Sequence, residues 1–107
     1  PLWKPYDPQV NDYVIWDRGE YGRDEGWVYF KGDVPVHKKG FPDRPRYITI
    51  ETSVKPKPNC MYSSGKPMKH KMIHTLLLCY EQDWWQLEYV RSRTPVERIQ
   101  HYSQCDD

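Results

Sequence analysis

Four side chains able to ligate zinc lie in the middle of the sequence. Cys60, His70, His74 and Cys79 have the spacing C-x9-H-x3-H-x4-C, and the His-x3-His pair matches half of a common zinc-binding pattern. The Cys-x2-Cys pair that usually accompanies it is absent from the sequence. On a strand, His70 and His74 would lie roughly 13 Å apart, at about 3.3 Å per residue, too far to share one ion, whereas on a helix they could share one. We therefore expect no metal and no cofactor, with Cys79 buried and the histidines at the surface.

The same residues do not predict a nucleophile. Cys79 belongs to the apolar run LLLCY, and burial raises the pKa of a thiol and so lowers its reactivity. The sequence contains no G-x-S-x-G, P-loop or G-x-G-x-x-G motif. Its acidic pair Asp24-Glu25 falls in a turn, where carboxylates are usually solvated. The sequence therefore predicts a protein that is not an enzyme.

Aromatic residues around the first predicted hairpin could bind a cation. Ring faces and carboxylates alternate along residues 16–29, and the four rings belong to Trp16, Tyr21, Trp27 and Tyr29. An exposed cation–π contact contributes about 0.5–1 kcal/mol, and more when water is excluded. This composition predicts a site for a methylated lysine or arginine. The alternative is that these rings form the core, because the domain has few aliphatic side chains to fill it.

A second aromatic feature is the pair Trp84-Trp85. On a strand, the two indoles would point to opposite faces, and we assign the exposed position to Trp85. An exposed Trp with arginines nearby, here Arg91 and Arg93, has the usual composition of a binding hot spot. This pattern predicts a protein- or peptide-binding surface.

The net charge of +1 hides a strongly basic middle segment. Residues 31–71 carry +7, whereas the segments before and after carry −3 each. The basic residues that we expect at a binding surface are Lys38, Lys39, Arg44 and Arg46. Two explanations stay open: a patch for an acidic segment or a single-stranded nucleic acid, or pairing with the acidic ends of the same domain. The pI of about 8.2 lies below the value above about 9 that is typical of nucleic-acid-binding domains.

Alternating hydrophobicity and turn residues predict five strands, at 12–17, 27–31, 46–54, 72–80 and 84–91. Residues 18–26 form the expected turn of the first hairpin, and two proline-rich loops separate the middle strands. Segment 72–80 is the most apolar and is expected to be the central strand. Within 27–31, Trp27 and Tyr29 should face away from Val28 and Phe30.

A short helix is expected at the end of the chain. Thr94 and Glu97 form a capping box, and Pro95 suits the first helical position. Val96 and Ile99 would then lie along one side, together with Tyr102 or Ser103.

Composition agrees with an all-β domain. The 107 residues include no alanine and ten prolines, and 15% are aromatic. We predict one domain over residues 1–107, a mainly antiparallel barrel or sandwich of five to seven strands with a short C-terminal helix. The opening hairpin, from NDYVIWD through a Gly-rich acidic turn to GWVYF, resembles the start of Tudor and other SH3-like barrels. That resemblance implies an SH3-like barrel.

The surroundings of the domain can also be anticipated. The longest apolar run is far shorter than the roughly 20 residues of a membrane-spanning helix, so no membrane is expected. An odd count of three cysteines favours a reducing compartment, the cytoplasm or the nucleus. A start at Pro1 suggests a domain excised from a longer protein. We expect a non-catalytic protein- or peptide-binding module; the alternatives are a single-stranded nucleic-acid-binding domain and a scaffold that positions its neighbours.

Overall fold

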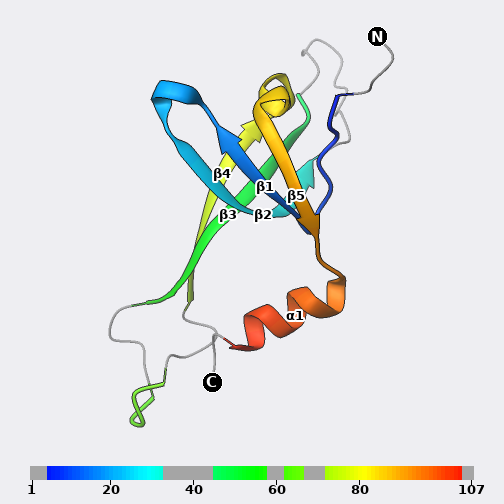
Figure 1. Cartoon of the computed structure of the whole chain (residues 1–107). Coiled ribbons are helices and arrows are strands. Elements are labelled where there is room, and N and C mark those ends of the chain that lie inside the picture. The colour runs from blue at the N-terminus through cyan, green and yellow to red at the C-terminus, as the bar shows by residue number, and fades with distance from the viewer. Residues whose placement is uncertain (1–4, 33–44, 58–61, 67–71, 105–107) are drawn as a thin grey trace, which may run out of the picture.

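The computed structural model describes residues 5–32, 45–57, 62–66 and 72–104, and its strands form one antiparallel sheet (Figure 1). The sheet has the order β4-β3-β2-β1-β5. Its strands are β1 (Asp12–Asp17), β2 (Arg23–Gly32), β3 (Tyr47–Pro56), β4 (Met72–Tyr80) and β5 (Leu87–Ser92). The first four strands form a meander, and β5 returns to pair with β1. The prediction of a mainly antiparallel β fold with a C-terminal helix is confirmed, whereas the sheet does not close into a barrel.

Three short helices complete the described part of the chain. The 3-10 helices η1 (Gly19–Tyr21) and η3 (Glu81–Gln86) connect β1 to β2 and β4 to β5, and α1 (Pro95–Gln104) follows β5. The expected cap of α1 is present, because the backbone N–H of Glu97 donates to Thr94 Oγ1 at 3.1 Å. None of these helices is long and apolar enough to cross a membrane.

The core lies on one side of the sheet. Alternate residues of β1 and β3 supply Val14, Trp16, Ile48 and Ile50, and the remaining strands and η3 supply Val28, Cys79, Trp84 and Leu87. Each large ring removes roughly 150–250 Å² from water, which compensates for the small number of aliphatic residues. Cys79 is buried as expected, and burial raises the pKa of its thiol to about 12.

The predicted central position of segment 72–80 and the predicted start of the last strand at Trp84 are wrong. Segment 72–80 forms β4, an edge strand of the described sheet, and as a result its apolar side chains Ile73, Leu76 and Leu78 are partly exposed. The Trp84-Trp85 pair belongs to η3 and not to the last strand, since the chain must turn there to bring Trp84 under the sheet. The first turn is also shorter than expected, as residues 23–26 already pair with β1.

One predicted face is also corrected. The register shifts between Val28 and Phe30, so Val28 enters the core whereas Phe30 is half exposed beside Tyr47, with 6.0 Å between the ring centroids. In α1, Val96 and Ile99 are largely exposed. The helix contacts the sheet instead through Arg98 and Tyr102, whose charge and hydroxyl find partners there.

Candidate functional site

The helix η3 holds its two tryptophans in opposite environments. Trp84 is 5% exposed, and its Nε1 donates a hydrogen bond to the carbonyl of Cys79 at 3.2 Å. Trp85 is 75% exposed. A 3-10 helix has three residues per turn, so neighbouring side chains point about 120° apart and one indole can anchor the helix while the next faces outward. The exposure of Trp85 agrees with the sequence-based expectation, although a strand was expected there.

Two hollows adjoin this helix, and Glu81 lines both. The larger has a volume of about 860 Å³, and its described lining is Pro45, Tyr47, Leu78, Tyr80, Glu81 and Gln82. The smaller has about 520 Å³ and is lined by Pro5, Tyr6, Asp7, Arg46, Glu81, Trp84 and Trp85. We call the residues of these two linings the η3 surface. Its volumes fall within the range of roughly 300–1,000 Å³ that is usual for ligand pockets.

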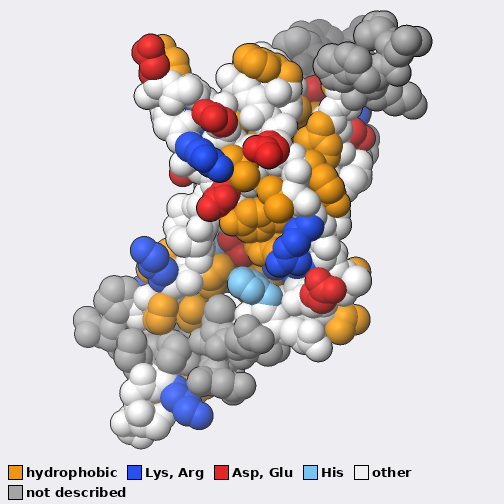
Figure 2. Space-filling model, in the orientation of Figure 1, with side chains coloured by type: hydrophobic (Ala, Val, Ile, Leu, Met, Phe, Trp, Pro, Cys, Tyr) orange, Lys and Arg blue, Asp and Glu red, His pale blue; other side chains and the backbone are white. Residues whose placement is uncertain are grey.

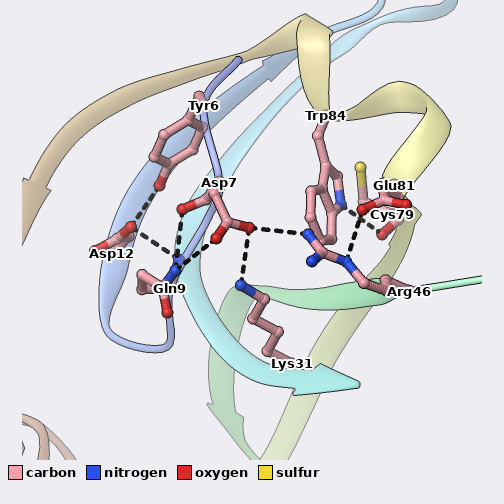
Figure 3. A network of polar contacts seen from close by, with 9 residues as sticks. All are labelled: Tyr6, Asp7, Gln9, Asp12, Lys31, Arg46, Cys79, Glu81 and Trp84. Carbon is pink, nitrogen blue, oxygen red and sulfur yellow. Dashed lines mark hydrogen bonds and ion pairs between the residues drawn. The ribbon is translucent and has the colours of Figure 1, made fainter. Parts of the chain in front are cut away.

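An ion-pair network borders the smaller hollow and reaches the larger one through Glu81 (Figure 3 shows the network). Arg46 Nε lies 2.6 Å from a carboxylate oxygen of Glu81, and Arg46 Nη2 lies 3.1 Å from Asp7 Oδ1. Lys31 Nζ reaches the same Asp7 oxygen at 2.9 Å. The hydrogen bond from Lys31, aided by the charges of Lys31 and Arg46, lowers the pKa of the Asp7 carboxyl. Lys31 and Arg46 of the basic segment are thus paired with Asp7 and Glu81, which lie outside that segment.

The buried indole of Trp84 packs against the two cations of this network. The guanidinium of Arg46 lies 4.9 Å from the centre of the Trp84 ring and the ammonium of Lys31 lies 5.5 Å away. Both cations therefore interact with one ring and with carboxylates at the same time. Arg46 is held in this way in the lining of the smaller hollow.

The N-terminal wall of the smaller hollow is also fixed. The hydroxyl of Tyr6 donates to Asp12 Oδ2 at 2.6 Å, and its ring lies 5.6 Å from that of Tyr89. Burial and the hydrogen bond to Asp12 raise the pKa of the Tyr6 phenol. Asp12 also accepts from the backbone N–H of Gln9 and from the Ser92 hydroxyl. This network ties the segment before β1 to β5.

The rings of Trp27 and Tyr29 lie on a different surface, beneath arginines of the same chain. The guanidinium groups of Arg91 and Arg93 lie 4.7 and 4.4 Å from the centre of the Trp27 ring. Arg98 of α1 lies 4.7 Å from the ring of Tyr29. Figure 2 shows hydrophobic side chains in the middle of the face above α1, with basic side chains beside them. The rings thus do attract cations, but cations of this chain occupy them.

A buried carboxylate joins α1 to this surface. Glu51 is buried, and the Tyr102 hydroxyl lies 3.0 Å from both of its oxygens. His74 Nδ1 lies 2.8 Å from Glu51 Oε2. Burial, followed by the hydrogen bond to Glu51, raises the pKa of the Tyr102 phenol, while Arg93 and Arg98 act in the opposite direction. Gly26 lets the β3 backbone approach at Glu51, where any Cβ on Gly26 would collide with the Glu51 carbonyl. We call Trp27, Tyr29, Glu51, Arg93, Arg98 and Tyr102 the α1-covered face.

The other residues predicted to contact a partner lie in different parts of the molecule. Trp16 lies in the core beneath Arg18, so its assignment as an exposed contact is corrected: the alternation along β1 buries Asp12, Val14 and Trp16 and leaves Tyr13 and Ile15 only partly buried. Tyr21 is 85% exposed at the hairpin tip and joins neither surface. Arg46 and Trp85 meet at the η3 surface. Lys38, Lys39 and Arg44 lie outside the described residues.

Sequence reasoning missed the larger hollow. Tyr47 and Tyr80 are direct partners across β3 and β4. Leu78 lies two residues before Tyr80, on the same face of β4. The signal in the sequence is the apolar run LLLCY, which is longer than the core requires and predicted a central strand.

The potential zinc ligands do not come together in the described part of the chain. His74 contacts Glu51 and Cys79 faces the core, while Cys60 and His70 lie outside the described residues. Among the residues with described positions, no group of three or more His, Cys, Asp or Glu side chains forms a metal-binding cluster.

Comparisons with known proteins assign no family. The sequence matches no protein-family model, and neither curated proteins nor solved structures give a significant match.

Proposed function

We propose that this chain is a non-catalytic protein- or peptide-binding module whose η3 surface takes an extended segment of a partner. The observation that carries the proposal is Trp85, which stands 75% exposed in the lining of a hollow next to Arg46. Exposing an indole to water is unfavourable, and an exposed Trp beside an Arg is the composition in which binding energy concentrates. The proposed surroundings, the cytoplasm or the nucleus, suit such a module.

The lining indicates the kind of segment. Both hollows are walled by prolines and aromatic rings, and grooves of this kind dock proline-containing segments in an extended polyproline II conformation. The Arg46–Glu81 pair between them offers a donor and an acceptor to the backbone of the bound segment. We therefore propose an extended segment that places one apolar or proline side chain in each hollow.

The finer fold assignment is part of the same proposal. A meander whose fifth strand returns to the first, with a 3-10 helix before that strand, supports a small SH3-like barrel that stays open between β4 and β5. The other proposed ligands draw less support. Methylated lysine would have to displace Arg93 and Arg98 from the rings, and a nucleic acid would compete with Asp7 for Lys31 and Arg46.

A peptide-library selection tests the proposal. The labelled domain is panned against phage-displayed random peptides, and the enriched peptides are titrated in heteronuclear NMR experiments. We expect the indole of Trp85 and the amides of η3 to shift. Trp85→Ala should weaken binding by about 30-fold, since a hot-spot residue contributes at least about 2 kcal/mol.

Tyr21→Ala is the matched control, because Tyr21 is an equally exposed ring far from η3 in the sequence and absent from both linings. It should leave affinity unchanged. Equal loss in the two variants, or enriched peptides that shift only residues outside the η3 surface, would reject the assignment. A uridine oligonucleotide titrated at low and high salt separates the nucleic-acid alternative, which predicts steep salt dependence.

A further inference from the structure

Arg93 has an incomplete set of hydrogen bonds. It is 6% exposed, and guanidinium groups are almost never so buried without partners. Its Nε donates to Asn11 Oδ1 at 3.2 Å, and its backbone N–H donates to the Asn11 carbonyl at 2.9 Å. Nη1 and Nη2 are buried and make no well-formed hydrogen bond in the described part of the chain; Arg93 has only a weaker side-chain contact with the Tyr102 hydroxyl, which acts to lower the pKa of that phenol. A buried polar group without a partner calls for a physical explanation.

Aromatic rings satisfy the faces of this guanidinium but not its edge. The group lies 4.4 Å from the centre of the Trp27 ring and 5.7 Å from that of Tyr102. Cation–π contacts act on the faces, whereas the N–H donors of arginine lie in the plane of the group. An acceptor must therefore approach in that plane, and two parallel N–H donors match the two oxygens of a carboxylate or phosphate.

A small cavity lies next to Arg93, between β5 and α1. It has a volume of about 180 Å³ and is lined by Trp27, Arg91, Arg93, Glu97, Gln100 and His101. This volume equals roughly six waters of the liquid and is below the roughly 300 Å³ of a small-molecule pocket, so it suits one charged group. Arg91 adds a second guanidinium, 4.7 Å from the centre of the Trp27 ring. None of these lining residues belongs to the η3 surface.

We propose that this cavity binds an oxyanion, a carboxylate or phosphate group carried by an acidic segment of a partner. Arg93 provides the in-plane donors Nη1 and Nη2, which an oxyanion reaches only when the side chains around them shift, because both nitrogens have almost no exposed surface. Arg91 adds a rim charge, and Trp27 holds both guanidinium groups in place. Glu97 is the carboxylate in the cavity lining, and its repulsion keeps the affinity of the site low. The site is a second contact beyond the η3 surface, and its ligand chemistry is opposite to that of a cation-binding aromatic cage.

A phosphate titration of the labelled domain tests this site. Inorganic phosphate is compared with chloride at matched ionic strength, while the Arg93 Nε–Hε and Trp27 indole signals are followed. We expect saturable shifts of both signals. Arg93→Lys, which keeps the charge and loses the planar pair of donors, should weaken binding roughly tenfold or more. Glu97→Gln should strengthen it about two- to fivefold, because a like charge is removed.

Exposed positions keep the test decisive if Arg93→Lys fails to fold. Arg91→Gln should weaken phosphate binding, whereas Lys66→Gln removes an equal charge from an exposed residue outside the cavity and should not. Linear, unsaturated shifts, or one affinity for the Arg91, Glu97 and Lys66 variants, would overturn the proposal.

The source of the oxyanion is identified with short peptides that carry phosphoserine or aspartate at one position. Stronger binding of either peptide than of its serine counterpart is expected and names the source, whereas equal binding of all three contradicts an acidic segment as the ligand. Trp85→Ala should leave phosphate binding unchanged, so a failure at the η3 surface and a failure at this cavity are distinguishable.

Discussion

The η3 surface and the α1-covered face contain the same kinds of side chain but arrange them differently. At the η3 surface, Lys31 and Arg46 are paired with carboxylates, and Trp85 is left open. On the α1-covered face, Arg93 and Arg98 lie over aromatic rings without an ion pair in the described part of the chain. The location of the carboxylates decides which surface keeps an exposed ring.

Glu51 shows how this division arises. It is the acidic residue nearest to the covered rings in the register, opposite Trp27, yet its oxygens are taken by Tyr102 and His74. The arginines therefore turn to the rings, which hold them by contacts of about 0.5–2 kcal/mol each. At the η3 surface, Asp7 and Glu81 are half exposed and meet the cations at the rim. Trp85, beyond that rim, carries no cation of this chain in the described structure and stays exposed.

The adjacent tryptophans of η3 give the largest expected effect. Trp84→Ala removes a buried ring from beneath Arg46 and should lower the free energy of unfolding by about 3–5 kcal/mol. Trp85→Ala should change it by less than about 0.5 kcal/mol, as for other surface substitutions. Denaturant unfolding measures both. Equal destabilisation would mean that Trp85 is part of the core and not a binding residue.

The docking of α1 gives the next largest effect. Tyr102→Phe removes the hydroxyl that lies between α1 and the buried Glu51 carboxylate. Hydrogen bonds to charged groups contribute roughly 1.5–3 kcal/mol, so we expect α1 to become more exposed to exchange by about that amount. Amide hydrogen exchange over residues 95–104 measures the change.

Tyr89→Phe is the control for α1 docking, since the Tyr89 hydroxyl lies beside Ser92 at an exposed position of β5. It should leave exchange in α1 unaltered. If Tyr102→Phe also leaves it unaltered, contacts other than the Tyr102–Glu51 hydrogen bonds, such as that of Arg98 with Tyr29, hold the helix.

The thiol beneath η3 reports whether that surface is rigid. In a Cys60→Ser/Cys105→Ser variant, Cys79 should resist a thiol reagent at neutral pH and react after unfolding, because the thiol is buried. Its pKa is raised from 9.0 to about 12. Its contribution to stability is therefore complete below pH 9 and is lost as pH rises towards 12, with a limiting slope of about 1.4 kcal/mol per pH unit. Rapid native-state reaction would show that η3 opens readily.

The sequence predicted the strands better than their order. Residues 12–17 and 72–80 are strands at the expected bounds, because each alternates or is apolar between clear breakers. Their neighbours depend on pairings distant in sequence, such as β1 with β5, for which local pattern carries no signal. Trp84 shows the same limit, since a core contact overrides the strand propensity of its segment.

The candidate site was predictable only in part. Trp85 and Arg46 were named from composition, and both line the η3 surface. Trp16 was not separable from Trp85, since whether a Trp faces core or solvent depends on a register that the sequence leaves open. The arginines over Trp27 and Tyr29 come from β5, the segment after it and α1, more than sixty positions away in the chain, so no local motif could have indicated them.

Removing the carboxylate at the rim gives the smallest expected effect and the sharpest test of the comparison. Asp7→Asn leaves Lys31 and Arg46 without their shared partner. The loss of stability should stay below about 1 kcal/mol, because Asp7 is half exposed and its pairs are screened by solvent. Lys31 and Arg46 lower the pKa of Asp7, so its contribution is present above its ordinary pKa and disappears as pH falls through the lowered folded-state value. The wild type and Asp7→Asn should therefore differ at neutral pH and converge in acid. If they differ by the same amount throughout, Asp7 acts by packing, and the contrast between ion-paired and ring-stacked cations does not explain why the η3 surface stays open.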